Sequence, residues 1–218
     1  MNIGFVTIGM APRDDLLGVF EARLGANHDL RLVGALDGLS QADVAGLAPH
    51  ETEEPLVTQA HQGQPVTIAR EQIIGKMQQR IDELEQDGAD LVVVLCTGPF
   101  PELSAKVPLL FPDLVLQHFV RGVFPKGDLG VISPLVSQQP MMRQKWHDYP
   151  TVRMDALDPY GQETSGSKLA NFDSCGVIVL DCMGYTPRIR ATVREQTGKP
   201  VVLAQDVLAH AVEVLVGE

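Results

Sequence analysis

The chain has 218 residues, of which 44% are hydrophobic and 21% charged, a composition typical of a globular protein. The 17 Lys and Arg residues against 28 Asp and Glu residues give a net charge of −11. This charge disfavours binding to nucleic acid or to an anionic membrane surface, because both attract clustered basic residues. An anionic ligand would have to be attracted by local groups, since the field of the whole chain repels it.

From the first residues of the chain we expect no secretion signal. Met1-Asn2 leads straight into an apolar run, without a basic segment or a cleavage site. No apolar run approaches the ~20 residues that a membrane-spanning helix needs. With an odd number of cysteines, 3 in all, we expect free thiols in the cytoplasm.

Strand-like apolar runs alternate with helical patterns along the whole chain, which predicts an α/β fold with mainly parallel sheets. Ser40 is a favourable N-cap for a segment that begins at Gln41. In the first half we expect strands at 3–8, 32–36, 91–95 and 114–116, helices at 12–24, 70–86 and 101–107, and a short strand or hairpin near Val57 and Val66.

The pattern of alternating strands and helices begins again after Phe124–Gly127, which divides the chain into lobes 1–125 and 126–218. The final helix is allowed to pack back on the first lobe. In the second half we expect strands at 129–134, 152–156, 177–181 and 200–203, and helices at 137–147, 161–170, 187–197 and 206–216. Each half runs strand, helix, strand, helix, cysteine strand, helix. A true internal duplication and a chance likeness both remain open.

Cys96 and Cys182 end two β-branched runs, and each is separated from a following glycine by one residue. Ligands of open α/β folds bind at the carboxyl ends of the strands, so we expect a cleft with one thiol on each wall. Such a pair can remove a proton from one face of a carbon and add one to the other. Loops that lead into helices supply N–H groups that favour a thiolate. The alternative is ordinary packing, because free cysteines are often buried.

Other polar residues near these strands have two interpretations. Cys175 precedes its strand, so we interpret it as structural. Asp181 faces away from Cys182 by strand alternation and serves either catalysis or a neighbouring basic or backbone group. Arg188 and Arg190 either anchor an acidic substrate or form a solvated helix face.

The end of the first strand carries Thr7, Gly9 and Arg13 in a turn that leads into a helix N-terminus, a favourable place for an anion. Arg13 either grips a carboxylate through two bonds or faces solvent. Ser133 is the corresponding hydroxyl in the second half, or an N-cap before Pro134.

The sequence favours neither a metal nor a cofactor. The 6 histidines show no metal-ligand spacing, and there is no Cys-x-x-Cys pair. No phosphate-binding or dinucleotide-binding glycine motif occurs. We therefore expect no metal and no cofactor.

Four segments, 6–12, 36–40, 144–146 and 180–185, resemble the AroM family, in an order and spacing that cover essentially the whole chain. That family is similar to the aspartate/glutamate/hydantoin racemase superfamily, which includes maleate isomerases and arylmalonate decarboxylases. The resemblance implies two pseudosymmetric Rossmann-like lobes with mainly parallel four-stranded sheets. It implies catalysis without a cofactor, with Cys96 and Cys182 in the positions of the catalytic pair.

The resulting hypothesis is a racemase or isomerase that moves protons between two thiols on a small carboxylate-bearing molecule. The substrate-binding groups would be Thr7, Gly9, Arg13, Thr97, Gly98, Ser133, Met183, Gly184 and Tyr185. The racemases usually follow the first cysteine with Asn-Thr and the second with Thr, so amino-acid specificity does not carry over to this chain.

Two alternatives stay open. One is a decarboxylase or cis–trans isomerase of the same fold that uses Cys182 alone. The other is a non-catalytic small-molecule-binding or regulatory protein, which the family name links to aromatic amino-acid metabolism. The expected partner is a small carboxylate-bearing ligand, with a homodimer as an option and neither nucleic acid nor a membrane.

Overall fold

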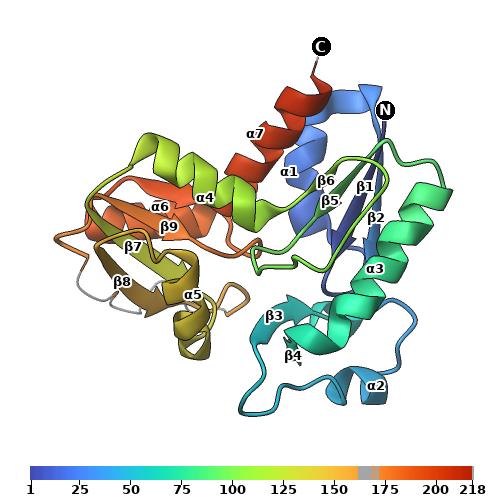
Figure 1. Ribbon diagram of the computed structural model, residues 1–218, viewed down its shortest axis with the longest axis horizontal. Coiled ribbons are helices and arrows are strands. Elements are labelled where there is room, and N and C mark those ends of the chain that lie inside the picture. The colour runs from blue at the N-terminus through green and yellow to red at the C-terminus, as the bar shows by residue number, and fades with distance from the viewer. Residues whose placement is uncertain (162–168, 170–171, 218) are drawn as a thin grey trace. The chain divides into compact units, whose positions relative to one another are not determined.

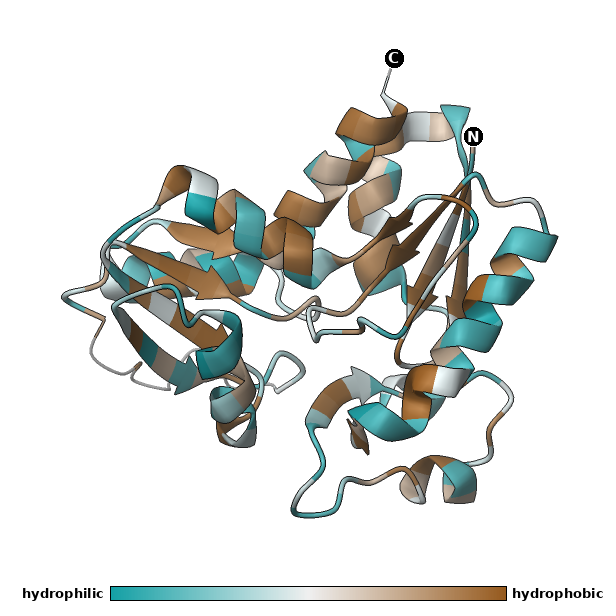
Figure 2. Ribbon diagram, viewed as in Figure 1, coloured by the Kyte–Doolittle hydropathy of each residue, from teal (hydrophilic) through white to brown (hydrophobic). Residues whose placement is uncertain are grey.

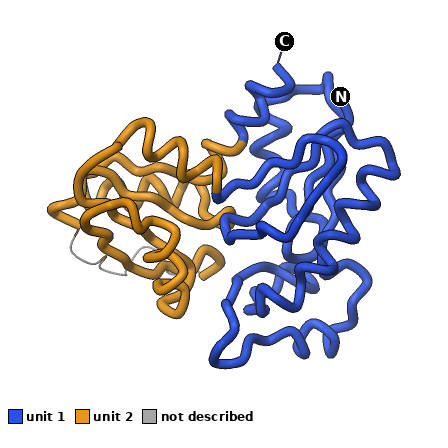
Figure 3. The backbone as a smooth tube through the Cα atoms, viewed as in Figure 1, with its two compact units in different colours: residues 1–113, 209–218 blue, residues 114–208 orange. Residues whose placement is uncertain are grey.

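The computed structural model describes residues 1–161, 169 and 172–217. The chain divides into two compact units (Figure 3), residues 1–113 with 209–218, and residues 114–208. Unit 1 is therefore built from two separate stretches of chain, and unit 2 from one. The lobes 1–125 and 126–218 stay a prediction.

Unit 1 contains a four-stranded sheet in which all neighbouring strands run parallel (Figure 1). Its strands, in the spatial order β2-β1-β5-β6, are β2 (Asp29–Gly34), β1 (Asn2–Thr7), β5 (Leu91–Val94) and β6 (Leu109–Leu110). The central strands β1 and β5 are almost fully buried, which explains their nearly continuous apolar sequence. Figure 2 shows the same strands in brown.

The helices of unit 1 follow from the spacing of their apolar residues. The helix α3 (Arg70–Gln86) has the bounds predicted and buries Ile73, Met77 and Ile81 at four-residue spacing. The other helices are α1 (Asp14–Leu24), the short α2 (Gln41–Ala45) and the three-residue turns η1 (Gly25–Asn27) and η2 (His61–Gly63). Ser40 caps α2 in a capping box with Asp43, as predicted.

Unit 1 also contains an antiparallel hairpin of β3 (Pro55–Gln59) and β4 (Pro65–Ala69), which confirms the hairpin predicted near Val57 and Val66. The hairpin is tied to the turn after β1, because the Met10 N–H donates to the Gln59 carbonyl at 3.0 Å.

Unit 2 repeats the sheet with the same connectivity. Its parallel strands, in the order β10-β9-β7-β8, are β10 (Val201–Leu203), β9 (Val177–Leu180), β7 (Asp128–Ser133) and β8 (Thr151–Ala156). In both sheets the first strand in sequence lies between the second and the third. The α/β class and the two parallel four-stranded sheets are thus confirmed.

The remaining helices are α4 (Pro112–Val123), the turn η3 (Val136–Gln138), α5 (Gln139–Lys145), α6 (Pro187–Thr197) and α7 (Ala204–Val216). The helix α6 begins after an N-cap bond from the Ile189 N–H to Thr186 Oγ1 and ends at Gly198, which takes the left-handed conformation at φ 66°. Both ends agree with the prediction.

Two predicted elements are wrong. The segment 101–107 is irregular and not helical, because its chain is fixed by contacts from a distant side chain, described below. The segment 114–116 is part of α4 and not a strand: Pro112 suits the start of a helix, and Leu116 and Val120 are buried at helical spacing. The helix predicted at 161–170 falls largely outside the described residues.

Within the described part of the chain, no helix combines the length and the apolar character needed to cross a membrane.

Candidate functional site

The predicted catalytic cysteines lie at the topological switch point of each sheet. The chain passes from β1 outward to β2 and then returns to the other side of β1 at β5, and β7, β8 and β9 repeat this path. In open α/β sheets, ligands bind at the carboxyl ends of the strands at such a point. Thr7 ends β1 and Cys96 follows β5, whereas Ser133 ends β7 and Cys182 follows β9.

The backbone is bonded in the same way at the two switch points. In unit 1 the Leu95 N–H donates to the Val6 carbonyl at 2.8 Å. In unit 2 the Asp181 N–H donates to the Ile132 carbonyl at 2.9 Å. Each bond joins the residue before the cysteine to the residue before the hydroxyl side chain. The two cysteines therefore occupy equivalent positions in equivalent frames.

Each thiol accepts a hydrogen bond from the glycine two residues further on. The Gly98 N–H lies 3.4 Å from Cys96 Sγ, and the Gly184 N–H lies 3.3 Å from Cys182 Sγ. A donor aimed at sulfur favours the thiolate over the thiol. Cys96 is only 8% exposed, whereas Cys182 is half-buried.

The two hydroxyl side chains beside the cysteine strands are buried but bonded differently. Thr7 Oγ1 accepts from the Gly9 N–H at 3.3 Å, in the same residue spacing as at the thiols. Ser133 Oγ instead donates to the Leu135 carbonyl at 3.1 Å. A hydroxyl that accepts one bond can still donate its own proton.

Arg13 is buried and does not face solvent, which excludes the second interpretation of this residue. Its guanidinium grips a carboxylate through two bonds, but that carboxylate is Asp15 of the same chain, at 2.8 and 2.7 Å. A third, longer contact of 3.5 Å reaches Thr58 Oγ1 on the hairpin. Arg13 therefore ties the start of α1 to β3 in this state of the protein.

Asp181 is the partner of a basic group. Its carboxylate accepts from Lys145 Nζ at 2.8 Å and from Trp146 Nε1 at 2.9 Å, and all three side chains are buried. The ion pair fixes α5 to the residue that precedes Cys182. Because both of its carboxylate oxygens are engaged in these bonds, Asp181 has a structural role and stabilises the end of β9.

The loop after Cys182 is held by neutral groups. Tyr185 is fully buried, and its hydroxyl donates to the Leu157 carbonyl at 2.7 Å. Burial, with the nearby Cys182 and Asp181 charges, raises the pKa of Tyr185 well above its ordinary value, so the phenol stays protonated. Buried Gln205 donates to the Met183 carbonyl at 2.5 Å. Tyr185 thus braces the loop.

The glycines near the ends of the strands are enclosed by residues that the sequence does not mark. A Cβ atom added to Gly98 would lie 3.2 Å from Leu56 Cδ2 on β3, and one added to Gly9 would lie 2.3 Å from Thr58 Oγ1. The equivalent Gly184 is approached by the Tyr160 hydroxyl, 2.7 Å from an added Cβ. These neighbours come from elements far away in the sequence, so no local signal marks them.

Arg70 also encloses the loop after Cys96, and unlike these neighbours it is marked by an unusual feature of the sequence. It is the first residue of α3, where the helix dipole disfavours a cation. Its side chain is buried against the loop that follows Cys96.

The remaining candidates lie apart from the thiols or in ordinary structural positions. Cys175 is buried in the hydrophobic core of unit 2, and burial raises the pKa of its thiol. Arg190 is paired with Asp206, and Arg188 is exposed on the first turn of α6. Within the described residues, no group of three or more His, Cys, Asp and Glu side chains is arranged to hold a metal ion.

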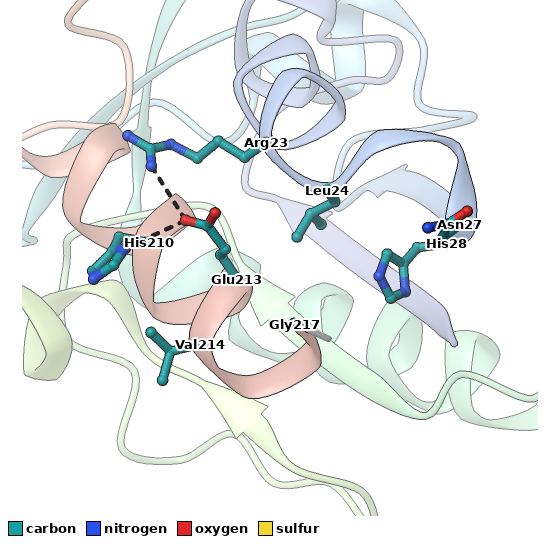
Figure 4. Close-up of a pocket in the computed structure, with 8 residues that line it drawn as sticks. All are labelled: Arg23, Leu24, Asn27, His28, His210, Glu213, Val214 and Gly217. Carbon is teal, nitrogen blue, oxygen red and sulfur yellow. Dashed lines mark hydrogen bonds and ion pairs between the residues drawn. The ribbon is translucent and has the colours of Figure 1, made fainter.

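A separate cavity of about 500 Å³ lies between the end of α1 and α7 in unit 1 (Figure 4). Glu213 reaches Arg23 and His210 there, each at 3.3 Å. His28 on the cavity wall directly precedes β2, so the cavity lies at the end of the sheet opposite to Thr7 and Cys96. It is not part of the candidate site.

The two parallel four-stranded sheets define an α/β protein whose fold is similar to that of a solved racemase, an isomerase and a decarboxylase. Aspartate racemase from Picrophilus torridus matches with a TM-score of 0.62 at 16% identity, over 99% of this chain and 94% of its own. Maleate isomerase Iso from Pseudomonas putida S16 matches with 0.62 at 13% identity, over 98% and 92%. A double mutant of arylmalonate decarboxylase in the liganded form matches with 0.61 at 14% identity, over 99% and 93%.

The family follows from the sequence itself. The model of the AroM family, described as AroM protein, matches residues 3–216. The chain therefore belongs to the AroM family. No curated protein sequence matches it.

Proposed function

We propose that this protein is a racemase or isomerase that acts without a cofactor on a small carboxylate-bearing molecule, with Cys96 and Cys182 as its acid–base pair. The observation that supports this most is the repeated geometry of the two thiols. Each follows the third strand of a parallel sheet at the switch point, and each receives a glycine N–H, at 3.4 Å in one unit and 3.3 Å in the other.

In the proposed reaction, one thiolate removes the proton from the carbon next to the carboxylate. The C–H bond breaks, an S–H bond forms, and the electron pair stays on the substrate as a carbanion or enolate. The other thiol then donates its proton to the opposite face, which leaves the two sulfurs with their protonation states exchanged. The mechanism requires that one substrate carbon meets both thiols, and the pair would titrate as a coupled unit.

Charge that develops on the substrate carboxylate needs donors, and each switch point offers them. The loops that begin at the two sulfurs carry the backbone N–H groups of Thr97 and Met183, whereas the Gly98 and Gly184 N–H groups are directed at the sulfurs themselves. The Thr7 hydroxyl is a further candidate donor, at the end of the strand β1 that pairs with β5. Fixed dipoles of this kind stabilise an oxyanion without a metal.

The direct test is deuterium incorporation from heavy water into a panel of small carboxylic and amino acids. Cys96→Ser and Cys182→Ser should each abolish exchange, because each thiol takes part in every turnover. Cys175→Ala is the matched control, since this third thiol lies in the core of unit 2 and should leave exchange unchanged. Full activity in both serine variants would contradict the two-thiol mechanism.

A one-cysteine enzyme, either a decarboxylase or a cis–trans isomerase, is the second candidate. It is favoured by the unequal exposure of the thiols, because Cys182 is half-buried whereas Cys96 is 8% exposed. It predicts that Cys182→Ser is inactive while Cys96→Ser remains active in the same assay. A non-catalytic binding protein would instead show a ligand-dependent rise in Tm with no product.

A further inference from the structure

The loop that follows Cys96 is clamped by one buried arginine. Arg70, 7% exposed, donates from Nε to the Pro99 carbonyl at 2.6 Å. Its Nη2 donates to both carboxylate oxygens of Glu102, at 2.8 and 2.7 Å. The guanidinium also lies over the ring of Phe100, 5.4 Å from the ring centroid. One side chain thus contacts three of the four residues from Pro99 to Glu102.

The clamp acts close to the bond that Cys96 receives. Gly98 precedes Pro99, and Pro99 and Pro101 each have a fixed φ, so the loop has few torsions left to vary. Fixing the Pro99 carbonyl therefore also fixes the neighbouring residue Gly98, whose N–H points at Cys96 Sγ. On its other side Gly98 is confined by Leu56 of β3.

The position of Arg70 is unfavourable for the helix that carries it. A cation at the first residue of α3 meets the positive end of the helix dipole, and a buried guanidinium loses its hydration. Three carboxylates lie near the guanidinium and offset these costs: Glu102 at 2.7 Å, Glu71 at 3.6 Å and Glu54 at 3.7 Å. The loop after Cys182 is held by the neutral side chains of Gln205 and Tyr185.

We propose that Arg70 is a positioning residue for Cys96, which holds the Gly98 N–H against the sulfur and thereby sets how readily this thiol ionises. The proposal rests on the proposed function only in naming Cys96 as a reacting group. Arg70 acts through the loop and not through contact with substrate. Its effect on Cys96 exists whether or not a substrate is bound.

Arg70 could affect the ionisation of Cys96 by positioning the loop or only through its charge, and three variants separate these two explanations. Arg70→Gln removes both the charge and the fork of donors. Arg70→Lys keeps the charge but cannot bond Pro99 and Glu102 together, because an ammonium lacks the planar fork. Glu102→Gln keeps the Arg70 charge and weakens the clamp. Positioning predicts that all three make Cys96 harder to ionise, whereas charge alone predicts no effect of Arg70→Lys and the opposite effect of Glu102→Gln.

The experiment is the rate of iodoacetamide alkylation against pH, followed at each cysteine by mass spectrometry in the full-length protein. The pH midpoint for Cys96 should rise by about one unit in Arg70→Gln and Arg70→Lys, which is a tenfold loss of thiolate at neutral pH. Cys182 is the internal reference and should keep its midpoint. Lys76→Gln is the matched control, because it removes a cation from α3 without touching the loop.

An unchanged Cys96 midpoint in Arg70→Lys and Glu102→Gln would overturn the proposal, as would an equal shift at Cys182. If Arg70→Gln fails to fold, the other two variants carry the test. The failure of the proposed function gives a different result, namely no deuterium exchange in the wild type together with an intact Arg70 effect on alkylation. With a substrate in hand, Arg70→Lys should lower kcat and leave KM nearly unchanged.

Discussion

Cys96 and Cys182 follow equivalent strands and receive equivalent N–H bonds, but the side chains that support them differ in kind. The residue before the thiol is apolar Leu95 in unit 1 and the ion-paired Asp181 in unit 2. After the thiol, the first loop is clamped by Arg70 and the second by neutral side chains. The backbone frame is repeated, whereas the surroundings that set each thiol's acidity are not, so we expect the two sulfurs to differ in reactivity.

The largest stability difference between the two strand ends should come from Asp181. Asp181→Asn leaves the buried Lys145 ammonium without its charge partner, and breaking a buried pair in this way costs about 3–5 kcal/mol. Urea unfolding measures the loss. The double variant Asp181→Leu with Lys145→Met imitates the apolar Leu95 end and should recover part of it. A double variant no more stable than Asp181→Asn would contradict this account.

The stability cost of replacing a glycine after a strand with alanine should depend on the atoms that surround it. Gly9→Ala places a Cβ 2.3 Å from Thr58 Oγ1 and 2.4 Å from the Gln59 carbonyl oxygen, so the hairpin must shift. Overpacking of this kind costs about 1–3 kcal/mol. Gly184→Ala meets the end of the Tyr160 side chain and should cost less. Gly18→Ala in α1, with open space around it, is the control and should stabilise the protein by about 0.5–1 kcal/mol.

The helix after the second cysteine loop gives a smaller effect. Thr186 caps α6, with its Oγ1 3.3 Å from the Ile189 N, whereas the first loop leads into no helix at 101–107. Thr186→Ala should therefore cost about 1 kcal/mol by thermal or urea unfolding, and Thr186→Ser should restore the cap. Equal stability of the alanine and serine variants would show that the cap contributes nothing.

The smallest effect should be a pH dependence of stability that arises in the loop after Cys96. Hydrogen bonds from Arg70 hold the pKa of Glu102 below its ordinary value of 4.5. A carboxyl whose pKa is lowered by folding stabilises the protein fully above the unfolded value and loses this contribution as pH falls through the folded value. The stability difference between wild type and Glu102→Gln should therefore be constant near neutrality and shrink below pH 4.5. A stability difference between the two proteins that grows as the pH falls would contradict this prediction.

Most of the fold could be predicted from local sequence pattern. The helix α3 follows from four apolar residues at helical spacing, and the strands from runs that are buried on both faces. The loop 97–102 could not be predicted, because its shape depends on Arg70, 29 residues from Pro99. The helix predicted over 101–107 is wrong for the same reason, because Arg70 also bonds Glu102 within that segment.

The candidate site also has a part that could be predicted from the sequence and a part that could not. Alternation of strands and helices predicts that Thr7, Cys96, Ser133 and Cys182 lie at the carboxyl ends of central strands. Thr7 and Ser133 are the last residues of β1 and β7, and Cys96 and Cys182 follow β5 and β9 by two residues. What each side chain contacts was not predictable, since Tyr185 is bonded to Leu157, 28 residues away. Arg13 is different, because its partner Asp15 is a near neighbour in sequence.

The discontinuity of unit 1 has a practical consequence for fragments of this protein. A polypeptide of residues 114–208 would carry the whole second sheet, because that unit is one continuous stretch. A polypeptide that stops at residue 113 would lack the last turns of α7, including Glu213, which is bonded to Arg23 of α1. Deletion of residues 209–218 should therefore destabilise unit 1 before unit 2.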